Sequence, residues 1–229
     1  IVASSLIISA ILNVNVAAGQ KTPKSNKLVY TQSFDRDDAR TDFVFTQDEK
    51  WIMSEGKKGN ALEFTGISDY QPPHRSPHTF GIIKDLVVGS FVLEADMLQT
   101  GKEYGHRDMC IAFGFQDPAN FYYAHIATAM DDNAHQIMLV KNAPRTKIST
   151  FTTKGVDWGQ DKWNKVRVER NIEDGTIKVF FNGTLVEEAK DKTFGKGYIG
   201  FGSFDDSGKI DNIRIWAPEK EEKSINYFK

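Results

Sequence analysis

The sequence predicts an all-β protein, a two-sheet antiparallel β-sandwich of the jelly-roll type. After residue 26, no long stretch has the 3.6-residue period of an amphipathic helix. Short runs rich in β-branched and aromatic residues recur instead between turn residues, which is typical of sandwiches and barrels. Two hairpin signals, Asp174-Gly175 and Asn182-Gly183, join neighbouring runs with residues that tight β-turns favour.

The expected strands follow one another along the whole chain after residue 26. Residues 163–170 alternate: Val166 and Val168 face one side, and the charged residues between them face the other. This alternation predicts an antiparallel strand with one buried and one solvated face. The segments expected to be strands are residues 27–34, 50–53, 60–65, 80–88, 90–98, 108–116, 120–128, 134–141, 146–152, 163–170, 175–181, 184–189, 197–204 and 208–216.

The two ends of the chain differ from the rest. Residues 1–16 are apolar and carry no charge, and the small residues of Ala17-Ala18-Gly19 follow as a signal peptidase requires. We expect a partial signal peptide at 1–18, a linker at 19–26, one β-sandwich domain at 27–217 and a charged, frayed tail at 218–229. The protein is therefore expected to be secreted or periplasmic, free of the membrane after cleavage. An uncleaved membrane anchor is the alternative.

Charge composition argues against two classes of partner. The chain has 29 Lys and Arg against 31 Asp and Glu, and the two signs are interspersed. Neither a basic surface for nucleic acid nor a polybasic run for lipid headgroups is present in the sequence. The single cysteine, Cys110, lies in an apolar run and is expected to be a small buried residue.

Several segments in the second half of the chain carry a family resemblance. They are residues 91–96, 112–123, 163–168, 175–183, 197–202 and 210–215. Their order and spacing resemble the concanavalin A-like lectin/glucanase superfamily, in its laminin-G-like and 3-keto-disaccharide hydrolase-like branches. The resemblance implies a jelly roll that binds a carbohydrate in a groove on one sheet face.

Two carboxylates in the strand 90–98 are candidate ligand-binding residues. Glu94 and Asp96 share one face by alternation. The laminarinase branch of the superfamily places a third acidic residue where this sequence has Gln99, which cannot exchange the proton that retaining hydrolysis requires. We therefore expect a polar sheet face, or hydrogen bonds to sugar, and no laminarinase-type hydrolysis.

All five histidines lie between residues 74 and 135. Sheet order can bring the loops 71–79 and 101–108 and the strand around His125 to one rim. Polar donors and Tyr rings there would suit sugar hydroxyls and apolar sugar faces, and imidazole with carboxylate would equally suit a transition metal. Solvated histidines in separate loops are the alternative. The expected ligand-binding residues of this rim are His74, Arg75, His78, His106, Arg107 and Tyr123.

Two other functions stay open. The resemblance to keto-disaccharide hydrolases implies a hydrolase or lyase of 3-keto-glycosides, in which a base removes the proton at sugar C2 and the group at C1 departs. His125 and His135 are the candidate catalytic bases, because imidazole titrates near neutral pH. A structural or adhesive laminin-G-like module without a small ligand is the third alternative. If His125 lies in a groove, His125→Ala should abolish binding and leave stability nearly unchanged.

A structural Ca²⁺ is expected near the chain ends of the domain. Asp35 follows the first expected strand and Asp211 lies in the last, and the terminal strands of jelly rolls often run close together. Carboxylate oxygens are ligands that Ca²⁺ prefers. The alternative is that Asp211 accepts hydrogen bonds from the backbone.

Overall fold

The computed structural model describes residues 26–225, 227 and 228. The predicted signal peptide and most of the predicted linker lie outside these residues. In the part that is described, no helix has the length and apolarity needed to cross a membrane.

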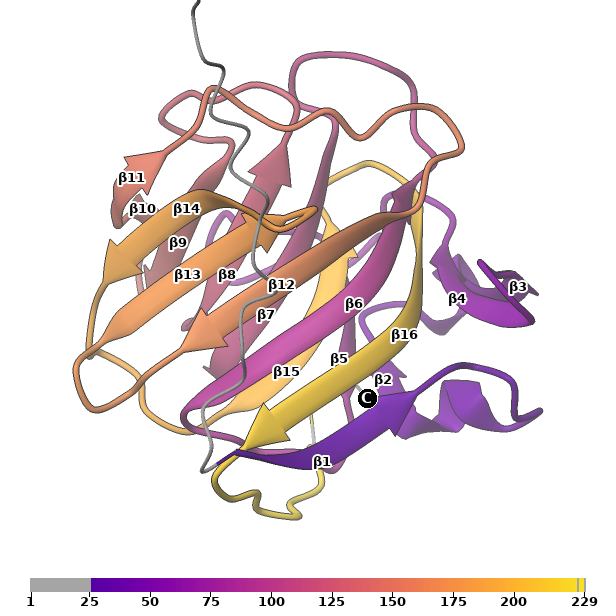
Figure 1. Cartoon of the computed structure of the whole chain (residues 1–229), viewed down its shortest axis with the longest axis horizontal. Helices are drawn as coiled ribbons and strands as arrows, with labels where there is room; N and C mark the ends of the chain where they lie inside the picture. Colours follow the sequence, from indigo (N-terminus) through magenta and orange to yellow (C-terminus); the bar gives the residue numbers. More distant parts are fainter. Residues whose placement is uncertain (1–25, 226, 229) are drawn as a thin grey trace, which may run out of the picture.

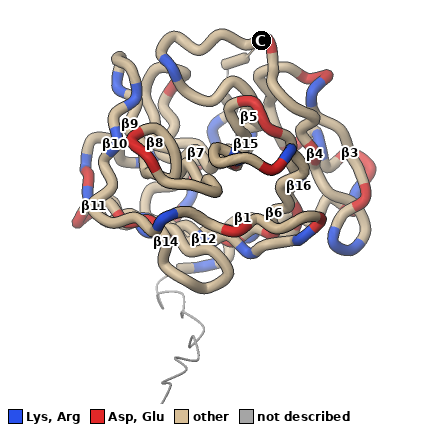
Figure 2. The backbone as a smooth tube through the Cα atoms, turned by 90° about the horizontal axis from the view of Figure 1, so that it is seen from above, with Lys and Arg blue, Asp and Glu red and all other residues tan. Residues whose placement is uncertain are grey.

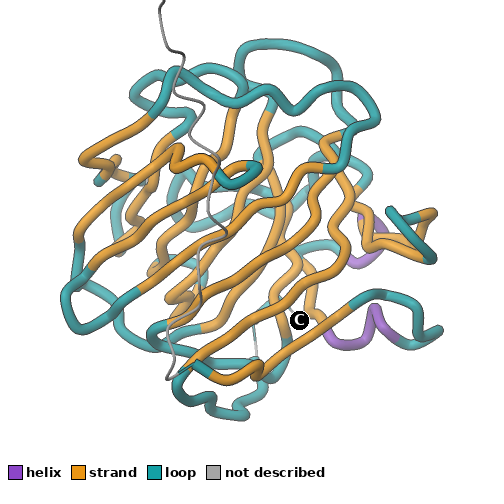
Figure 3. Tube along the Cα trace, viewed as in Figure 1, coloured by secondary structure: helices purple, strands orange, loops and turns teal. Residues whose placement is uncertain are grey.

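Two antiparallel sheets form a sandwich, as the sequence predicts (Figure 1). Figure 2 shows the sheets as separate layers, and Figure 3 shows loops joining the strands at both ends of the layers. Two short 3₁₀ turns, η1 (Ala39–Asp42) and η2 (Asp48–Lys50), flank the strand β2 (Phe43–Phe45). Sheet A has nine strands in the order β11 (Ser149–Thr152), β14 (Thr184–Lys190), β13 (Thr176–Phe181), β12 (Asn164–Arg170), β6 (Phe91–Gln99), β16 (Gly208–Ala217), β4 (Asn60–Phe64) and β3 (Trp51–Glu55), with β1 (Lys27–Gln32) also paired to β16. Sheet B has seven strands in the order β10 (Thr146–Lys147), β9 (Gln136–Lys141), β8 (Asn120–Ala127), β7 (Asp108–Asp117), β15 (Tyr198–Ser203), β5 (Thr79–Ile83) and β2 (Phe43–Phe45).

The hairpin between β13 and β14 shows how local sequence sets the register. Asn182 and Gly183 both have positive φ, 50° and 84°, as the two central residues of a type I′ turn do. The turn places Phe181 opposite Thr184, and the backbone amide of Lys165 on β12 donates to the Asn182 side chain at 2.9 Å. The sequence prediction of this hairpin is confirmed.

Alternating residues of both sheets fill the space between them. Leu93, Ala95 and Met97 of β6 face Ile111 and Phe113 of β7, all in one apolar cluster that is closed to solvent. The residues between them in sequence therefore lie on the outer faces. Asp108 and Cys110 of β7, and Tyr123 and His125 of β8, accordingly point outward from sheet B.

A second apolar layer covers part of the outer face of sheet B. Phe80, Phe115, Phe121 and Tyr123 contribute to it, and the carboxyl-terminal segment lies across it. Ile225 is only 3% exposed, and its backbone amide donates to the Lys84 carbonyl at 3.0 Å. The expectation of a frayed tail from residue 218 is therefore wrong for this segment, because its apolar side chains complete this layer.

Candidate ligand-binding site

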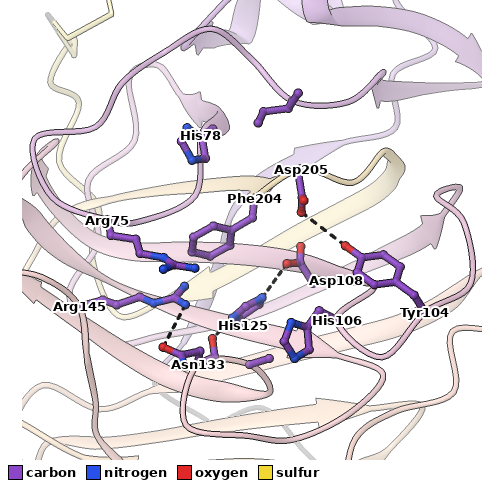
Figure 4. Close-up of a pocket in the computed structure, with 12 residues that line it drawn as sticks. Arg75, His78, Tyr104, His106, Asp108, His125, Asn133, Arg145, Phe204 and Asp205 are labelled. Carbon is purple, nitrogen blue, oxygen red and sulfur yellow. Dashed lines mark hydrogen bonds and ion pairs between the residues drawn. The ribbon is translucent and has the colours of Figure 1, made fainter.

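A pocket of about 440 Å³ opens on the outer face of sheet B, where β7 and β9 begin and β8 ends (Figure 4). We call it the sheet B pocket. Side chains from the strand ends form its floor, and loops that reach over this edge form its walls. It is lined by Ile67, Arg75, His78, Tyr104, His106, Asp108, His125, Asn133, Ala134, Arg145, Phe204 and Asp205.

The floor is built around a buried pair, Asp108 and His125. The Nε2 atom of His125 lies 2.6 Å from Oδ2 of Asp108, and Nδ1 donates to the Asn133 carbonyl at 2.8 Å. The hydroxyl of Ser203 donates to the other carboxylate oxygen of Asp108. Both ring nitrogens of His125 thus face oxygen acceptors, and neither is free to take a proton from a ligand.

The loop that follows β8 is held by Asp131. Its Oδ1 accepts the backbone amides of Asn133 and Ala134 at 2.6 and 2.8 Å, and its Oδ2 pairs with His106 Nε2 at 2.8 Å. Partial burial raises the pKa of Asp131, but these hydrogen bonds outweigh burial and hold the pKa below its ordinary value. The loop is therefore fixed in a form that carries Asn133 and Ala134 into the pocket wall.

Arg145 is fixed on three sides. Its Nη1 donates to the Tyr123 hydroxyl at 3.1 Å, and its Nη2 donates to Oδ1 of Asn133 at 3.4 Å. Its guanidinium carbon lies 4.4 Å from the centre of the Phe204 ring, within cation–π range. The positive charge of Arg145 is thus held in one place before any ligand arrives.

Carboxylates gather at the opposite end of the pocket. The Tyr104 hydroxyl donates to Asp206 at 3.1 Å and lies 3.4 Å from Asp205. Asp206 also accepts the backbone amide of Asp108 at 2.8 Å. Burial, together with the charges of Asp108 and Asp205, raises the pKa of Asp206 to about 6.

One group of potential metal ligands lies at the floor. Asp108, Cys110 and His125 offer ligand atoms within 4.8 Å of one another. Burial and the nearby charge of Asp108 raise the pKa of the Cys110 thiol well above its ordinary value, whereas metal binding needs the thiolate. Nε2 of His125 is directed at Asp108. The donor set therefore fits a resident transition metal poorly, and the prediction of such a metal gains no support from it.

The structure brings only some of the predicted rim residues together. Arg75, His78, His106 and His125 line the pocket, while His74 does not. The idea that all five histidines form one site is therefore wrong in this structure.

Two of the predicted ligand-binding residues are buried beneath other groups. Arg107 is 4% exposed and donates to the carbonyls of Gln99 and Gly159, each at 2.8 Å, so it joins a strand end to a loop. Tyr123 is fully buried, with its ring centre 6.2 Å from that of Phe204. In this structure Phe204 occupies the aromatic position in the pocket that we expected Tyr123 to hold.

His135, a predicted catalytic base, lies between the two sheets. Its ring is closed to solvent, with Nε2 2.9 Å from the Thr153 hydroxyl and Nδ1 3.4 Å from Oε1 of Glu187 on β14. Burial, with a contribution from His125, lowers the pKa of His135 to about 4, and burial raises the pKa of Glu187 well above its ordinary value. Burial thus favours the neutral form of both groups, and no ligand on the surface reaches His135.

Glu94 and Asp96 lie on the outer face of the other sheet. Glu94 accepts from Arg167 Nη1 at 2.7 Å, and Asp96 lies 3.2 Å and 3.3 Å from the ammonium groups of Lys57 and Lys165. These carboxylates share a face, as alternation predicts. Since they are already paired with cations and lie across the sandwich from the sheet B pocket, they cannot contribute to that pocket.

Asp35 and Asp211 both contact the hairpin formed by β3 and β4, Asp35 at the first residue of β4 and Asp211 in the loop. Oδ1 of Asp35 lies 3.5 Å from the Asn60 amide, and Oδ2 of Asp211 accepts the Lys57 amide at 3.1 Å. Burial raises the pKa of Asp211, and the charges of Asp96 and Asp35 raise it further. Oδ1 of Asp211 also accepts the Asn212 amide at 2.6 Å. Three of the four carboxylate oxygens therefore already accept hydrogen bonds from the backbone, and a Ca²⁺ ion there stays a prediction.

Sequence reasoning missed Arg145, Phe204 and Asn133. Phe204 directly follows β15, and Arg145 directly precedes β10, so each lies at a strand end on the pocket edge. The strand order β10-β9-β8-β7-β15, which the sequence does not give, brings these ends together.

The fold and the pocket define a galectin-like or jelly-roll β-sandwich with a polar cavity on one sheet face. No known protein family matches the sequence, and no curated protein matches it. The structure is similar to the carbohydrate-binding module CBM66 from Bacillus subtilis, with a TM-score of 0.52 and 17% identity over 79% of this chain and 96% of the module.

Two further solved structures have the same architecture. Domain 4 of AbnA, a GH43 extracellular arabinanase from Geobacillus stearothermophilus solved with arabinotriose, gives a TM-score of 0.50 at 14% identity over 88% of this chain and 95% of the domain. A galectin-like protein from Bacillus subtilis, of unknown function, gives 0.53 at 11% identity over 86% of this chain and 100% of its own length. At these identities the likeness shows a shared fold.

Proposed function

We propose that this protein is a carbohydrate-binding module that holds a glycan in the sheet B pocket. The observation that carries the proposal is the pocket itself. Its floor is a fixed hydrogen-bonded pair, Asp108 and His125, and its walls combine charged and hydroxyl groups with the ring of Phe204. Sugars present hydroxyls beside apolar C–H faces, and a concave site with a few fixed polar groups and an aromatic ring matches both.

The structural neighbours support this proposal over a purely adhesive role. One is a carbohydrate-binding module, and another is a domain solved with a bound arabinotriose. A structural or adhesive module would favour a flat sheet face, whereas this face carries a cavity of about 440 Å³.

Two exposed aromatic residues provide a matched test. Tyr104 lies at the pocket and is 42% exposed, and Phe151 lies on the edge strand β11 of sheet A and is 45% exposed. Native gels containing polysaccharides should show the protein retarded by at least one glycan. Tyr104→Ala should remove the retardation, and Phe151→Ala should keep it. If no glycan retards the protein, or if both variants behave alike, the pocket is not a carbohydrate site.

An enzymatic function is the second candidate, with different residues from those first expected. His78 uses Nδ1 at the Tyr70 carbonyl, 3.1 Å away, and His106 uses Nε2 at Asp131. Each therefore keeps one ring nitrogen without a hydrogen-bond partner in the described residues, as a base requires. Turnover of a 3-keto-glycoside that is lost in His78→Gln or His106→Gln would establish this function, and absence of turnover would remove it.

We also propose that the chain is exported. The apolar residues 1–16 and the small residues 17–19 support this proposal. Intact-mass analysis of exported protein should give a mature chain that begins at or near Gly19. A retained apolar segment in a membrane fraction would contradict export in soluble form.

A further inference from the structure

The sheet B pocket has a positive end formed by two arginines. Arg75 comes from the loop before β5, and Arg145 comes from the turn before β10. In Figure 4 both side chains enter from the same side, and their guanidinium groups are directed toward Phe204. The two arginines lie far apart in the sequence, and the fold brings them together.

Neither guanidinium has a carboxylate partner in the described part of the chain. The salt bridges there include neither Arg75 nor Arg145. Most arginines elsewhere in the fold are held by carboxylates or backbone carbonyls, as Arg167 is by Glu94 and Glu169. Two like charges that share one cavity repel each other, and an anion between them would relieve that repulsion.

The acidic groups in and beside the pocket already have other partners. Asp108 is paired with His125, and Asp131 is paired with His106. Asp205 lies beside Tyr104, at the end of the cavity opposite the arginines in Figure 4. No carboxylate of the lining is therefore placed to neutralise the two arginines.

The guanidinium group of Arg145 is also held in an orientation that suits an anion. Its contacts with Tyr123 and Asn133 use two of the five N–H donors that a guanidinium carries. The remaining donors are held in a fixed plane by the Phe204 ring, which suits the planar, two-pronged hydrogen bonding of a carboxylate or sulfate.

We propose that the sheet B pocket selects an acidic sugar unit, whose oxyanion lies between Arg75 and Arg145. The inference rests on the proposed carbohydrate-binding function and names the class of glycan. The hydroxyls of the same unit then face the Tyr104 and Asp205 end, where a carboxylate accepts their hydrogen bonds. The oxyanion is either the carboxylate of a uronic acid or a sulfate ester, and both present the same charge to the guanidinium pair.

The experiment compares sugars that differ in charge. Isothermal titration calorimetry would use oligogalacturonate, its methyl-esterified form, a sulfated carrageenan oligosaccharide, and neutral arabinan and xylan oligosaccharides. We expect one acidic probe to bind at least about tenfold more tightly than the neutral ones, since hydrogen bonds between charged groups are stronger than those between neutral groups. The oligogalacturonate and carrageenan arms distinguish a carboxylate from a sulfate.

The variants assign the effect to the arginines. Arg75→Gln should weaken acidic binding by about tenfold or more, and because Arg75 is exposed and makes no internal hydrogen bond in the described residues, folding should be unaffected. Arg145→Lys, which keeps the charge and loses the planar fork, should also weaken it. Arg214→Gln makes the same charge change at an exposed residue of β16, in the other sheet, and should bind like the wild type.

Each contrary result has a distinct meaning. If a neutral sugar binds as tightly as the acidic ones, and Tyr104→Ala removes that binding while Arg75→Gln does not, the acidic selection is wrong and the carbohydrate site stands. If acetate or inorganic sulfate competes at the concentration of the sugar, the arginines hold a simple anion and the inference fails. If no saccharide binds, the proposed function fails, and the inference fails with it.

Discussion

His125 lies at the centre of a chain of hydrogen bonds that crosses three strands. Ser203 of β15 donates to Asp108 of β7, Asp108 meets His125 of β8, and His125 reaches the Asn133 carbonyl. All of these groups except Asn133 are almost closed to solvent. A residue in such a chain supports the fold as well as the floor of the pocket.

Replacing His125 should therefore reduce stability. His125→Ala leaves the Asp108 carboxylate and the Asn133 carbonyl without their partner, at a cost of about 1–3 kcal/mol in the free energy of unfolding. The melting temperature measured by circular dichroism should fall by several degrees. From the sequence we expected His125→Ala to leave stability nearly unchanged if His125 lay in a groove, and to lower the melting temperature by several degrees if it were buried. With 4% of its surface exposed, His125 follows the second expectation.

His106→Ala is the matched control for that prediction. The side chain of His106 is 58% exposed and also pairs with an aspartate, Asp131. Its removal should change the free energy of unfolding by no more than about 0.5 kcal/mol. Equal melting temperatures for both variants would show that the buried chain contributes nothing.

The buried carboxyl group of Glu187 should make the protein less stable as the pH rises. Burial raises its pKa in the folded protein above the ordinary value of 4.5, so the folded state binds a proton that the unfolded state has released. The free energy of unfolding therefore falls as pH rises from about 4.5 toward the folded pKa. Glu187→Gln removes this loss. The free energy of unfolding of the variant relative to the wild type, measured by urea unfolding at pH 5, 7 and 9, should therefore increase as the pH rises. A constant difference would mean that Glu187 does not titrate on unfolding.

At the scale of elements, the carboxyl-terminal segment behaves as an added layer on sheet B. Glu221 exchanges backbone hydrogen bonds with Val87 at 2.9 and 3.0 Å, and Phe228 meets the Tyr70 ring edge-on at 5.2 Å. Its charged residues face solvent while Ile225 faces the layer beneath. The many charged residues of this segment predicted a solvated tail, but its apolar residues Ile225 and Phe228 pack against sheet B.

Ile225→Ala should loosen this segment without unfolding the sandwich. The lost burial reduces the local free energy of opening, so hydrogen exchange of residues 219–228, followed by mass spectrometry, should become faster. Exchange in β7 and β8 should stay slow. Glu222→Ala, an exposed change in the same segment, should leave the wild-type rates. Wild-type rates in Ile225→Ala would contradict the role of this contact.

β16 changes partners along its length, and Asp211 lies at the change. Residues 208–210 pair with β4, and residues 213–217 pair with β1, with an irregularity between. The predicted Ca²⁺ would bind here, beside Asp35 and the loop 56–60. Ca²⁺ at a hundred times its dissociation constant would add about 2.7 kcal/mol, a rise of several degrees in melting temperature.

The calcium prediction has its own controls. EDTA should reverse the rise, and Asp35→Asn should abolish it. Asp38→Asn removes a charge from an exposed residue of the same segment and should retain it. A melting temperature that is indifferent to Ca²⁺ and EDTA would show that Asp35 and Asp211 act only through the backbone hydrogen bonds.

At the scale of the whole molecule, most strands were predictable because their own residues carry the signal. The alternation in residues 163–170 became β12, and the Asn182-Gly183 turn became the β13–β14 hairpin. β2 was not predicted, because three residues give no period and its pairing comes from β5.

The pocket could be predicted only in part. Arg75 and the histidines of the loops were placed at one rim, but Arg145 and Phe204 reach it through strand order, which local sequence does not contain. His135 lies one residue before β9 and has a positive φ of 54°, so the alternation of the strand does not give the direction of its side chain, and its burial comes from the fold.

The two faces of the sandwich also determine how the molecule can be attached to something else. β1, the first described strand, belongs to sheet A, which lies across the sandwich from sheet B (Figure 2). The pocket opens on sheet B. A protein immobilised through its amino-terminal side would present the pocket to the medium. Attachment through the carboxyl-terminal side would bring the support to the same sheet face as the pocket, because the segment around Ile225 lies on that face. On a biosensor surface, the first orientation should bind long glycans and the second should exclude them.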